Sequence, residues 1–422
     1  MRPPVRRALY AATTLLVVLL LVEITARLLV APSTRSYGRF FGQELPPLEL
    51  IPYDDSPDQT DRNAPFGDLV VDGRKISSGD LWGFHRDDPL LGYAPKENTV
   101  SLNGWWQSNN IGARKRRDTH SAVAPGTTRL LVFGDSYAQA TRVKQEQAWP
   151  AVLETSRLET INFGVDGYGM AQSYLRYQQV EHRIEHDLVL LMFVPIKDLW
   201  RDINTIRSLA KDWDYYPVMP RFVLEEDELV LIESPYERNA QVFEENSPVV
   251  SDELKTHLRR YDRFYFEAEY RRPRLLGKLV LYKLPLRAYL TLRKRALYGR
   301  LDSDSEAVEV TRRIFEAMAE EVDRQGARFV LVYLPSRKDL KLLRSSADYA
   351  ANWKRIFAST CDRGFPCIDL SRAFLDATAE TLDTGYEGSH YGPRTNRLIA
   401  DLIGRALEEK GLVGPAVPDQ GS

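Results

Sequence analysis

From residue 128 onward, short runs that are apolar at every position alternate with stretches of helical periodicity. A continuous apolar run is typical of a strand that is buried on both faces of a parallel sheet. Strands that alternate with helices pair in parallel through right-handed crossovers, which place helices on both faces of the sheet. We therefore predict an α/β fold with a small doubly wound sheet. The predicted strands are RLLVFGD (129–135), TINFGV (160–165), DLVLLMFV (187–194), RFVLVYLP (328–335) and PCIDLS (366–371).

The other segments are arranged around this sheet domain, which we place at residues 126–412. We predict that residues 1–31 form a short cytoplasmic tip and a transmembrane anchor. Residues 32–125 are rich in Pro, Gly, Asp and aromatic residues and are predicted to form an irregular arm. A long insertion at about residues 205–305 separates the third and fourth strands, and residues 413–422 form a flexible tail. Because binding residues are frequent on loops, the insertion is the expected place for substrate selection.

Two charged segments lie within the insertion. The acidic one reads EEDELVLIESPYE (225–237), and the basic one reads KLVLYKLPLRAYLTLRKRALYGR (278–300). The basic segment is amphipathic enough to contact a membrane surface. Charge runs usually mark exposed faces, so the pattern favours the alternative, a solvated helical pair that covers the site.

The N-terminus combines a basic start with a long apolar run. The run from Ala8 to Val22 contains no charge, and it resumes after Glu23 and Arg27, which are spaced to pair on one helix face. A helix that continues to Val30 spans the ~30 Å of hydrocarbon in a bilayer, whereas a cleaved signal peptide has a similar basic start and apolar core. We favour an uncleaved single-pass anchor in the inner (cytoplasmic) membrane, with the main domain in the periplasm or otherwise outside the cytoplasm. The basic residues expected to hold the N-terminus in the cytoplasm are Arg2, Arg6 and Arg7.

Charge balance and cysteine content limit the possible partners. The chain has 57 basic and 59 acidic residues, so there is no basic excess to neutralise nucleic-acid phosphates, and we expect no nucleic-acid partner. The two cysteines, Cys361 and Cys367, are close enough in sequence for a local disulfide in an exported domain. Two buried free thiols are equally compatible with this pattern.

The first predicted strand ends at Gly134-Asp135-Ser136, so Ser136 is either a catalytic nucleophile or part of the cap of the next helix. Ligands of doubly wound sheets bind at the carboxyl ends of the strands, which favours the catalytic interpretation. A serine hydroxyl needs a base, and His390 directly precedes the closing helix, which starts at the same edge of the sheet. Glu387, or alternatively Asp383, is placed to fix the imidazole tautomer. Otherwise His390 is an ordinary loop residue near a helix cap.

Three blocks of the chain, in order, resemble the SGNH/GDSL family of esterases and lipases in its membrane-anchored bacterial form. The resemblance covers roughly residues 128–410. GDSY (134–137) is similar to the nucleophile block, NFGVDGYG (162–169) to the glycine block, and EGSHYGPRTNRLIADL (387–402) to the last block. The resemblance implies a three-layer α/β/α flavodoxin-like domain with about five parallel strands.

The resemblance also implies roles for individual residues. Ser136 would be the nucleophile and His390 the base, and the oxyanion would be held by the N–H groups of Ser136 and Gly167 and by an asparagine side chain. The family pattern has that asparagine after the third strand, where this chain reads FVPIKDLWRD and places Lys197. Lysine can donate to an oxyanion, but its long stem is less well preorganised. Glu387 likewise replaces the usual aspartate.

The expected function is a serine esterase that removes short acyl groups, most plausibly acetyl, from an envelope or exported glycan. An O-acyltransferase of the same fold would use the same residues. The third alternative is a non-catalytic glycan-binding or scaffolding protein, for which the departures at Lys197 and Glu387 are the support. The expected partners are therefore an acylated carbohydrate or small ester and the membrane. No cofactor is expected.

One further motif, HRIEH, fits the inverted zinc-protease pattern H-x-x-E-H through His182 and His186. Two histidines at i and i+4 on a helix can bind zinc. The stretch is highly charged and leads directly into the third predicted strand, so the end of a surface helix explains it equally well. We predict no metal site.

Overall fold

The computed structural model groups the chain into two compact units, which we describe separately. The first unit comprises residues 1–57 and 247–297, and the second comprises residues 58–246 and 298–422. The domain boundaries expected from the sequence stay predictions. In the structure, the expected arm and the expected insertion are each divided between the two units. The residues that the structure describes are 3–33, 36–48, 50, 69–71, 74–76, 84–101, 104–210, 218–235, 251–271, 275–298, 301, 304–378, 381–385 and 390–414.

A five-stranded parallel sheet forms the centre of the second unit, in the spatial order β14-β13-β10-β8-β9. Numbered along the chain, these strands run 2-1-3-4-5, which is the flavodoxin-like order of doubly wound sheets. The predicted fold class and all five predicted strands are therefore confirmed. The strands are β8 (Thr128–Phe133), β9 (Leu158–Asn162), β10 (Leu188–Phe193), β13 (Arg328–Tyr333) and β14 (Cys367–Asp369).

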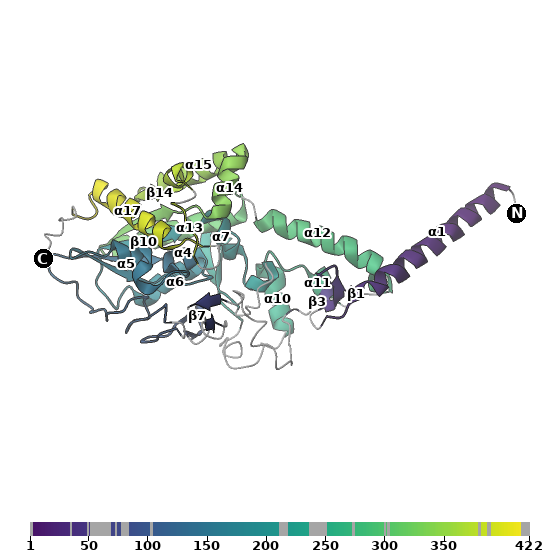
Figure 1. The fold of residues 1–422 in the computed structure, drawn as a ribbon, viewed down its shortest axis with the longest axis horizontal. Helices are drawn as coiled ribbons and strands as arrows, with labels where there is room; N and C mark the ends of the chain where they lie inside the picture. Colours follow the sequence, from purple (N-terminus) through teal and green to yellow (C-terminus); the bar gives the residue numbers. More distant parts are fainter. Residues whose placement is uncertain are drawn as a thin grey trace. The chain divides into compact units, whose positions relative to one another are not determined.

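Helices cover both faces of this sheet (Figure 1). Alternate strand residues point to opposite faces, so each strand contributes to two cores. On one face, Val132 and Leu190 belong to a buried cluster with Ile403 of α17 (Pro393–Glu409) and Trp149 of α5 (Trp149–Leu153). The opposite face packs through aromatic contacts against α6 (Met170–Val180), α13 (Glu306–Arg324) and α15 (Ala347–Cys361). These contacts are Phe133–Tyr177, Phe193–Phe315 and Tyr333–Trp353.

Most helices of the second unit follow a strand of the central sheet and connect it to the next strand.

Cys361 at the end of α15 and Cys367 at the start of β14 form a disulfide, the first of the two alternatives left open by the sequence. Three antiparallel hairpins lie outside the central sheet: β4 (Leu69–Val71) with β5 (Arg74–Ile76), β6 with β7, and β11 with β12. The element bounds are β6 (His85–Asp88), β7 (Gly92–Pro95), α4 (Ser136–Gln139), α5 (Trp149–Leu153), α6 (Met170–Val180), α7 (Pro195–Asp198), α8 (Arg207–Ala210), β11 (Arg221–Glu225), β12 (Glu228–Ile232), α13 (Glu306–Arg324), α14 (Arg337–Ser345), α15 (Ala347–Cys361), α16 (Ser371–Asp376) and α17 (Pro393–Glu409).

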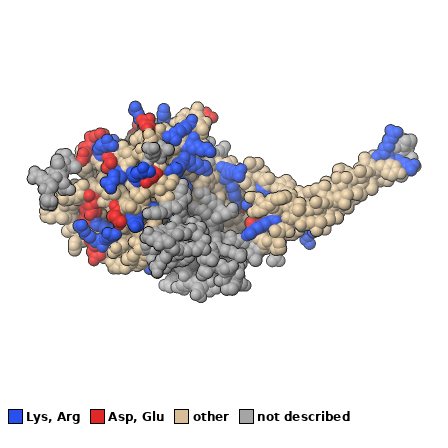
Figure 2. All heavy atoms as spheres, viewed as in Figure 1, with Lys and Arg blue, Asp and Glu red and all other residues tan. Residues whose placement is uncertain are grey.

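The first unit contains the N-terminal helix α1 and a small three-stranded antiparallel sheet. Among the described residues, α1 is the one helix that is both long enough and apolar enough to cross a membrane. Signal sequences share this property. In Figure 2, charged atoms gather at the N-terminal tip of α1, and the visible surface of the helix beyond the tip carries few of them. The bounds are α1 (Pro3–Leu28), β1 (Val30–Ala31), β2 (Ser36–Phe40), β3 (Gln43–Leu48), α10 (Asp252–Tyr261), α11 (Glu267–Tyr270) and α12 (Val280–Tyr298).

Candidate active site

Ser136 begins the short helix α4 at the carboxyl end of β8, the strand between β10 and the edge strand β9. The turn before it requires glycine, because Gly134 has φ +139° and a Cβ there would lie 2.7 Å from the carbonyl oxygen of Met192. The Asp135 carboxylate caps α4 by accepting a 2.8 Å hydrogen bond from the N–H of Tyr137. The first N–H groups of a helix have no acceptor four residues earlier, so the Ser136 N–H is available to a ligand. Helix capping and presentation of the serine therefore use the same turn.

His390 lies next to Ser136, although the two residues are 254 positions apart in the sequence. The Nε2 atom of His390 is 2.8 Å from the Oγ atom of Ser136. The imidazole packs against Tyr137, with the ring centroids 4.8 Å apart. Ser136 is almost completely buried, at 2 % exposure. A serine and a histidine at hydrogen-bond distance form the nucleophile–base pair that covalent acyl chemistry requires.

Two acidic residues, Glu387 and Asp383, are predicted to orient the His390 imidazole, and the structure describes only one of them. Glu387 lies outside the described residues. Asp383 is described, and its carboxylate accepts hydrogen bonds from the first turn of α17, the helix that follows His390. In this position Asp383 fixes the start of α17, and its role as a partner of His390 stays a prediction. Its contacts are Oδ1 with the N and Oγ1 atoms of Thr395, both at 2.8 Å, and Oδ2 with the N atom of Arg394 at 3.0 Å.

The glycine turn at residues 166–168 is held by its backbone carbonyl groups. Gly167 has φ +82°, and a Cβ there would lie 2.7 Å from the hydroxyl of Tyr93, so the turn favours glycine. Among the described residues, the Gly167 N–H has no acceptor, which leaves it available as an oxyanion donor. Three consecutive carbonyls each accept from a different side chain. The donors are the Tyr93 hydroxyl to Asp166 O, Arg207 Nε to Gly167 O at 3.3 Å, and Arg201 Nη1 to Tyr168 O at 2.9 Å.

Arg201 joins this glycine turn to the nucleophile turn. Its Nη1 atom also lies 2.8 Å from Asp135 Oδ2 and 2.9 Å from Asp198 Oδ1, and all three side chains are buried. Burial raises the pKa of Asp198, and the charge of Asp135 raises it further, whereas Arg201 acts in the opposite direction. Sequence reasoning missed Arg201. The available signal was its i, i+3 spacing from Asp198, just after the third strand.

Lys197 is half-buried on α7, at the carboxyl end of β10. Burial lowers the pKa of Lys197, and the charge of Arg201 lowers it further. The carboxylates of Asp135 and Asp166 act in the opposite direction. These charges act on Lys197 electrostatically, and its role as an oxyanion donor stays a prediction.

The HRIEH stretch does not form a two-histidine helix face. Helix α6 ends at Val180, and His182 and His186 lie in the turn that leads to β10. His182 is 3.2 Å from the carboxylate of Glu181, and His186 Nε2 is 3.2 Å from the hydroxyl of Tyr177. Across the described part of the chain, no group of three or more His, Cys, Asp or Glu side chains is placed to hold a metal ion.

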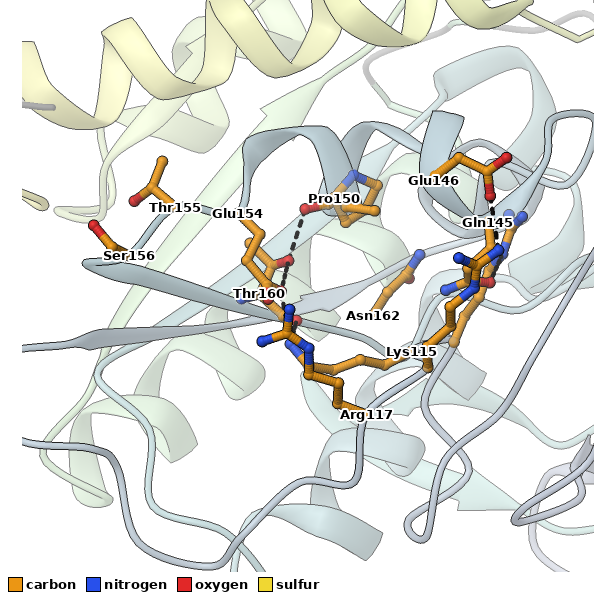
Figure 3. Close-up of a pocket in the computed structure, with 13 residues that line it drawn as sticks. Lys115, Arg117, Gln145, Glu146, Pro150, Glu154, Thr155, Ser156, Thr160 and Asn162 are labelled. Carbon is orange, nitrogen blue, oxygen red and sulfur yellow. Dashed lines mark hydrogen bonds and ion pairs between the residues drawn. The ribbon is translucent and has the colours of Figure 1, made fainter. Parts of the chain in front are cut away.

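Two hollows lie near the carboxyl edge of the sheet and its outer strand β9. The smaller one, of about 10 Å³, is lined by Ser136, His390 and Arg142, with Tyr137 and Tyr391 as aromatic walls. The larger one, of about 550 Å³, has a polar lining that includes Ser156. Figure 3 shows Lys115 crossing this larger hollow toward Glu154, to which it is bonded at 2.6 Å. Because the larger hollow contains neither Ser136 nor His390, the smaller one is the candidate active site.

Comparison with known proteins finds similarity in structure alone. No protein-family model and no curated protein matches the sequence. Similar solved structures include a member of the lipolytic protein G-D-S-L family from Veillonella parvula (11% identity, 67% of this chain and 97% of that one, TM-score 0.34). Two others are the psychrotrophic esterase EstA from Pseudoalteromonas sp. (11%, 67% and 98%, 0.33) and the acetyl xylan esterase AlAXEase (14%, 66% and 99%, 0.34).

Proposed function

We propose that the protein is a serine esterase of the SGNH/GDSL type that hydrolyses short acyl esters, with acetyl esters of an envelope or exported glycan as substrates. The observation that carries this proposal is the 2.8 Å contact between Ser136 Oγ and His390 Nε2. Two supporting features are the position of Ser136 at the carboxyl edge of the sheet and the N–H of Gly167, which has no acceptor among the described residues.

In the proposed reaction, Ser136 Oγ attacks the ester carbonyl while His390 Nε2 takes the hydroxyl proton. The carbonyl oxygen becomes an oxyanion, which the N–H groups of Ser136 and Gly167 stabilise together with Lys197. The C–O bond to the sugar then breaks, and His390 returns the proton to the leaving alkoxide. Water attacks the acyl-serine with His390 again as base, releasing the acid and restoring Ser136.

The small size of the hollow beside Ser136, about 10 Å³, disfavours a long acyl chain there. Helix α1 supports the anchor interpretation over the cleaved signal, because its C-terminal part packs into the first unit. Ala26 of α1 is buried with Val280 of α12, and the Glu23 carboxylate accepts from the Val280 N–H at 3.0 Å. Removal of α1 would leave this helix end without its cap.

A fluorophosphonate probe tests the proposal directly, since it labels only an activated serine. We expect stoichiometric labelling of the purified full chain, with the modified peptide containing Ser136. The His390→Gln variant should be labelled much more slowly, because the hydroxyl then lacks its base. Absence of labelling in folded protein would contradict both the esterase and the acyltransferase interpretations and would favour a binding or scaffolding protein.

We expect kcat of the Lys197→Ala variant to fall by about 10²-fold, the effect of removing one oxyanion donor, while measurable activity remains. Because the pKa of Lys197 is lowered, its charge is lost at a lower pH than that of an ordinary lysine. Wild-type kcat should therefore decline as pH rises through that lowered pKa, and the variant should lack this decline. A pH series with p-nitrophenyl acetate measures both effects.

Lys338→Ala is the matched control for this experiment. Burial lowers the pKa of Lys338 as well, but its ammonium lies 4.5 Å from the ring centroid of Tyr298. We expect this variant to keep the wild-type rate and pH profile. Unchanged activity in Lys197→Ala would show that Lys197 is not an oxyanion donor.

A further inference from the structure

Helix α12 presents an exposed face that is almost entirely apolar. Leu292 is 64 % exposed, Tyr289 53 % and Tyr282 49 %, and Pro285, Ala288 and Ala296 are exposed on the same side. The charged residues on this side are Arg293 and Arg295. The helix contains no Asp or Glu. An exposed apolar face of this kind usually marks a surface that contacts another apolar phase or partner.

The opposite side of α12 is already bound within the first unit. Lys283 donates a 2.6 Å hydrogen bond to the carbonyl of Pro46. Arg287 and Lys294 both pair at 2.7 Å with the carboxylate of Glu269, which is completely buried. These three cations are therefore satisfied by the protein itself. The apolar face is the side left for an outside partner; on it, Arg293 donates a 2.8 Å hydrogen bond to the hydroxyl of Tyr289 at the exposed surface.

The start of α12 is bound to the end of the candidate membrane helix. The Glu23 carboxylate of α1 accepts from the N–H groups of Val280 and Leu281, each at 3.0 Å. Arg27 pairs with Glu23 at 2.6 Å and donates to the carbonyl of Lys278 at 3.2 Å. Glu23 lies about five residues, or about 8 Å, before the end of α1. If the apolar run that ends at Val22 lies in the bilayer, so that the hydrocarbon ends near Glu23 and not at Val30 as the sequence predicts, α12 begins at the level of the lipid headgroups.

We propose that α12 lies in the outer interface of the membrane that α1 spans, with its apolar face toward the acyl chains. Tyrosine side chains favour this depth, because the ring is apolar and the hydroxyl reaches water. Arg293 and Arg295 would contact lipid phosphates, and the absence of acidic residues in α12 suits an anionic lipid surface. This proposal depends on the membrane anchor and does not depend on the esterase activity.

Fluorescence quenching in nanodiscs tests the position of α12. The full chain is reconstituted into nanodiscs of phosphatidylethanolamine and phosphatidylglycerol and labelled at Leu292→Cys with an environment-sensitive dye. The introduced thiol is the only free one, because both native cysteines are joined in a disulfide. Arg405→Cys, on the exposed side of α17, is the matched control. We expect acyl-brominated lipids to quench the dye at least twofold at Leu292 and negligibly at Arg405, with aqueous iodide giving the reverse order.

Further variants separate the possible failures. A dye at Leu15→Cys reports whether α1 is in the bilayer, and it should be quenched by the brominated lipids. Replacing Arg293 and Arg295 by glutamine should weaken lipid quenching at Leu292 most strongly in anionic nanodiscs. The proposal is overturned if Leu15 is not quenched by lipid. It is also overturned if Leu292 is open to iodide like Arg405, or is shielded from both quenchers, as a covering protein or second copy would cause.

Discussion

The Ser136→Ala variant is expected to hydrolyse p-nitrophenyl acetate with kcat reduced on the order of 10⁴-fold or more. The reason is that the hydroxyl 2.8 Å from His390 Nε2 supplies the atom that forms the acyl-enzyme. The remaining groups of the site, including the free N–H of Gly167, can still stabilise an oxyanion formed by direct attack of water. The variant should therefore retain a small rate of ester hydrolysis above that of the buffer, and we expect it to fold normally.

Two companion variants make this result specific. Ser156→Ala removes a serine from the larger hollow, which contains neither Ser136 nor His390, and should leave the rate unchanged. The double variant Ser136→Ala/His390→Gln should be no slower than Ser136→Ala, because residues that act as a unit have non-additive effects. A Ser136→Ala protein as active as wild type would show that the proposed mechanism is wrong.

The fold could be predicted because its signal is local and repeated. Each strand of the central sheet is a short apolar run, and the strand β8 (Thr128–Phe133) begins within one residue of its predicted position. The direction of pairing follows from the helices between the strands. The contacts of the first unit could not be predicted in this way. The bond between Glu23 and the start of α12 joins residues 257 positions apart, and no sequence pattern links them.

The candidate site could be predicted only in part, for a similar reason. Ser136 and His390 could be predicted because each lies beside a recognisable strand end or helix start at the same edge of the sheet. The side chains that hold the glycine turn could not, since Tyr93, Arg201 and Arg207 come from three different segments. A buried arginine has no periodic signal, and its partners depend on how the loops pack. The orienting acid at Glu387 stays a prediction.

The Arg201→Met variant is expected to be destabilised by about 3–5 kcal/mol, the cost of leaving buried charges without their partner. Arg201 is 3 % exposed, and its Nη1 atom bridges the buried carboxylates of Asp135 and Asp198. Methionine fills a similar space but neutralises neither carboxylate. Urea unfolding of the detergent-solubilised full chain, followed by tryptophan fluorescence, measures the loss, because Trp200 lies beside the Arg201 guanidinium.

The pH dependence of this loss distinguishes unpaired charge from poor packing. The pKa of Asp198 is already raised in the folded protein, and removing Arg201 removes a charge that opposes this rise. A carboxyl whose pKa is higher in the folded state than in the unfolded state gains stability as pH falls through the folded-state pKa. The deficit of Arg201→Met should therefore be largest at neutral pH and shrink on acidification, and Asp198→Asn in the same chain should recover part of it.

A matched control comes from Arg116, whose 3.0 Å pair with Glu146 is solvent-exposed on both sides. Arg116→Met should change the free energy of unfolding by no more than about 1 kcal/mol, as for other exposed ion pairs. If Arg201→Met were equally mild, or if its deficit did not vary with pH, the buried carboxylates would not depend on Arg201 for their charge balance. The connection between the nucleophile turn and the glycine turn would then have to come from backbone packing alone.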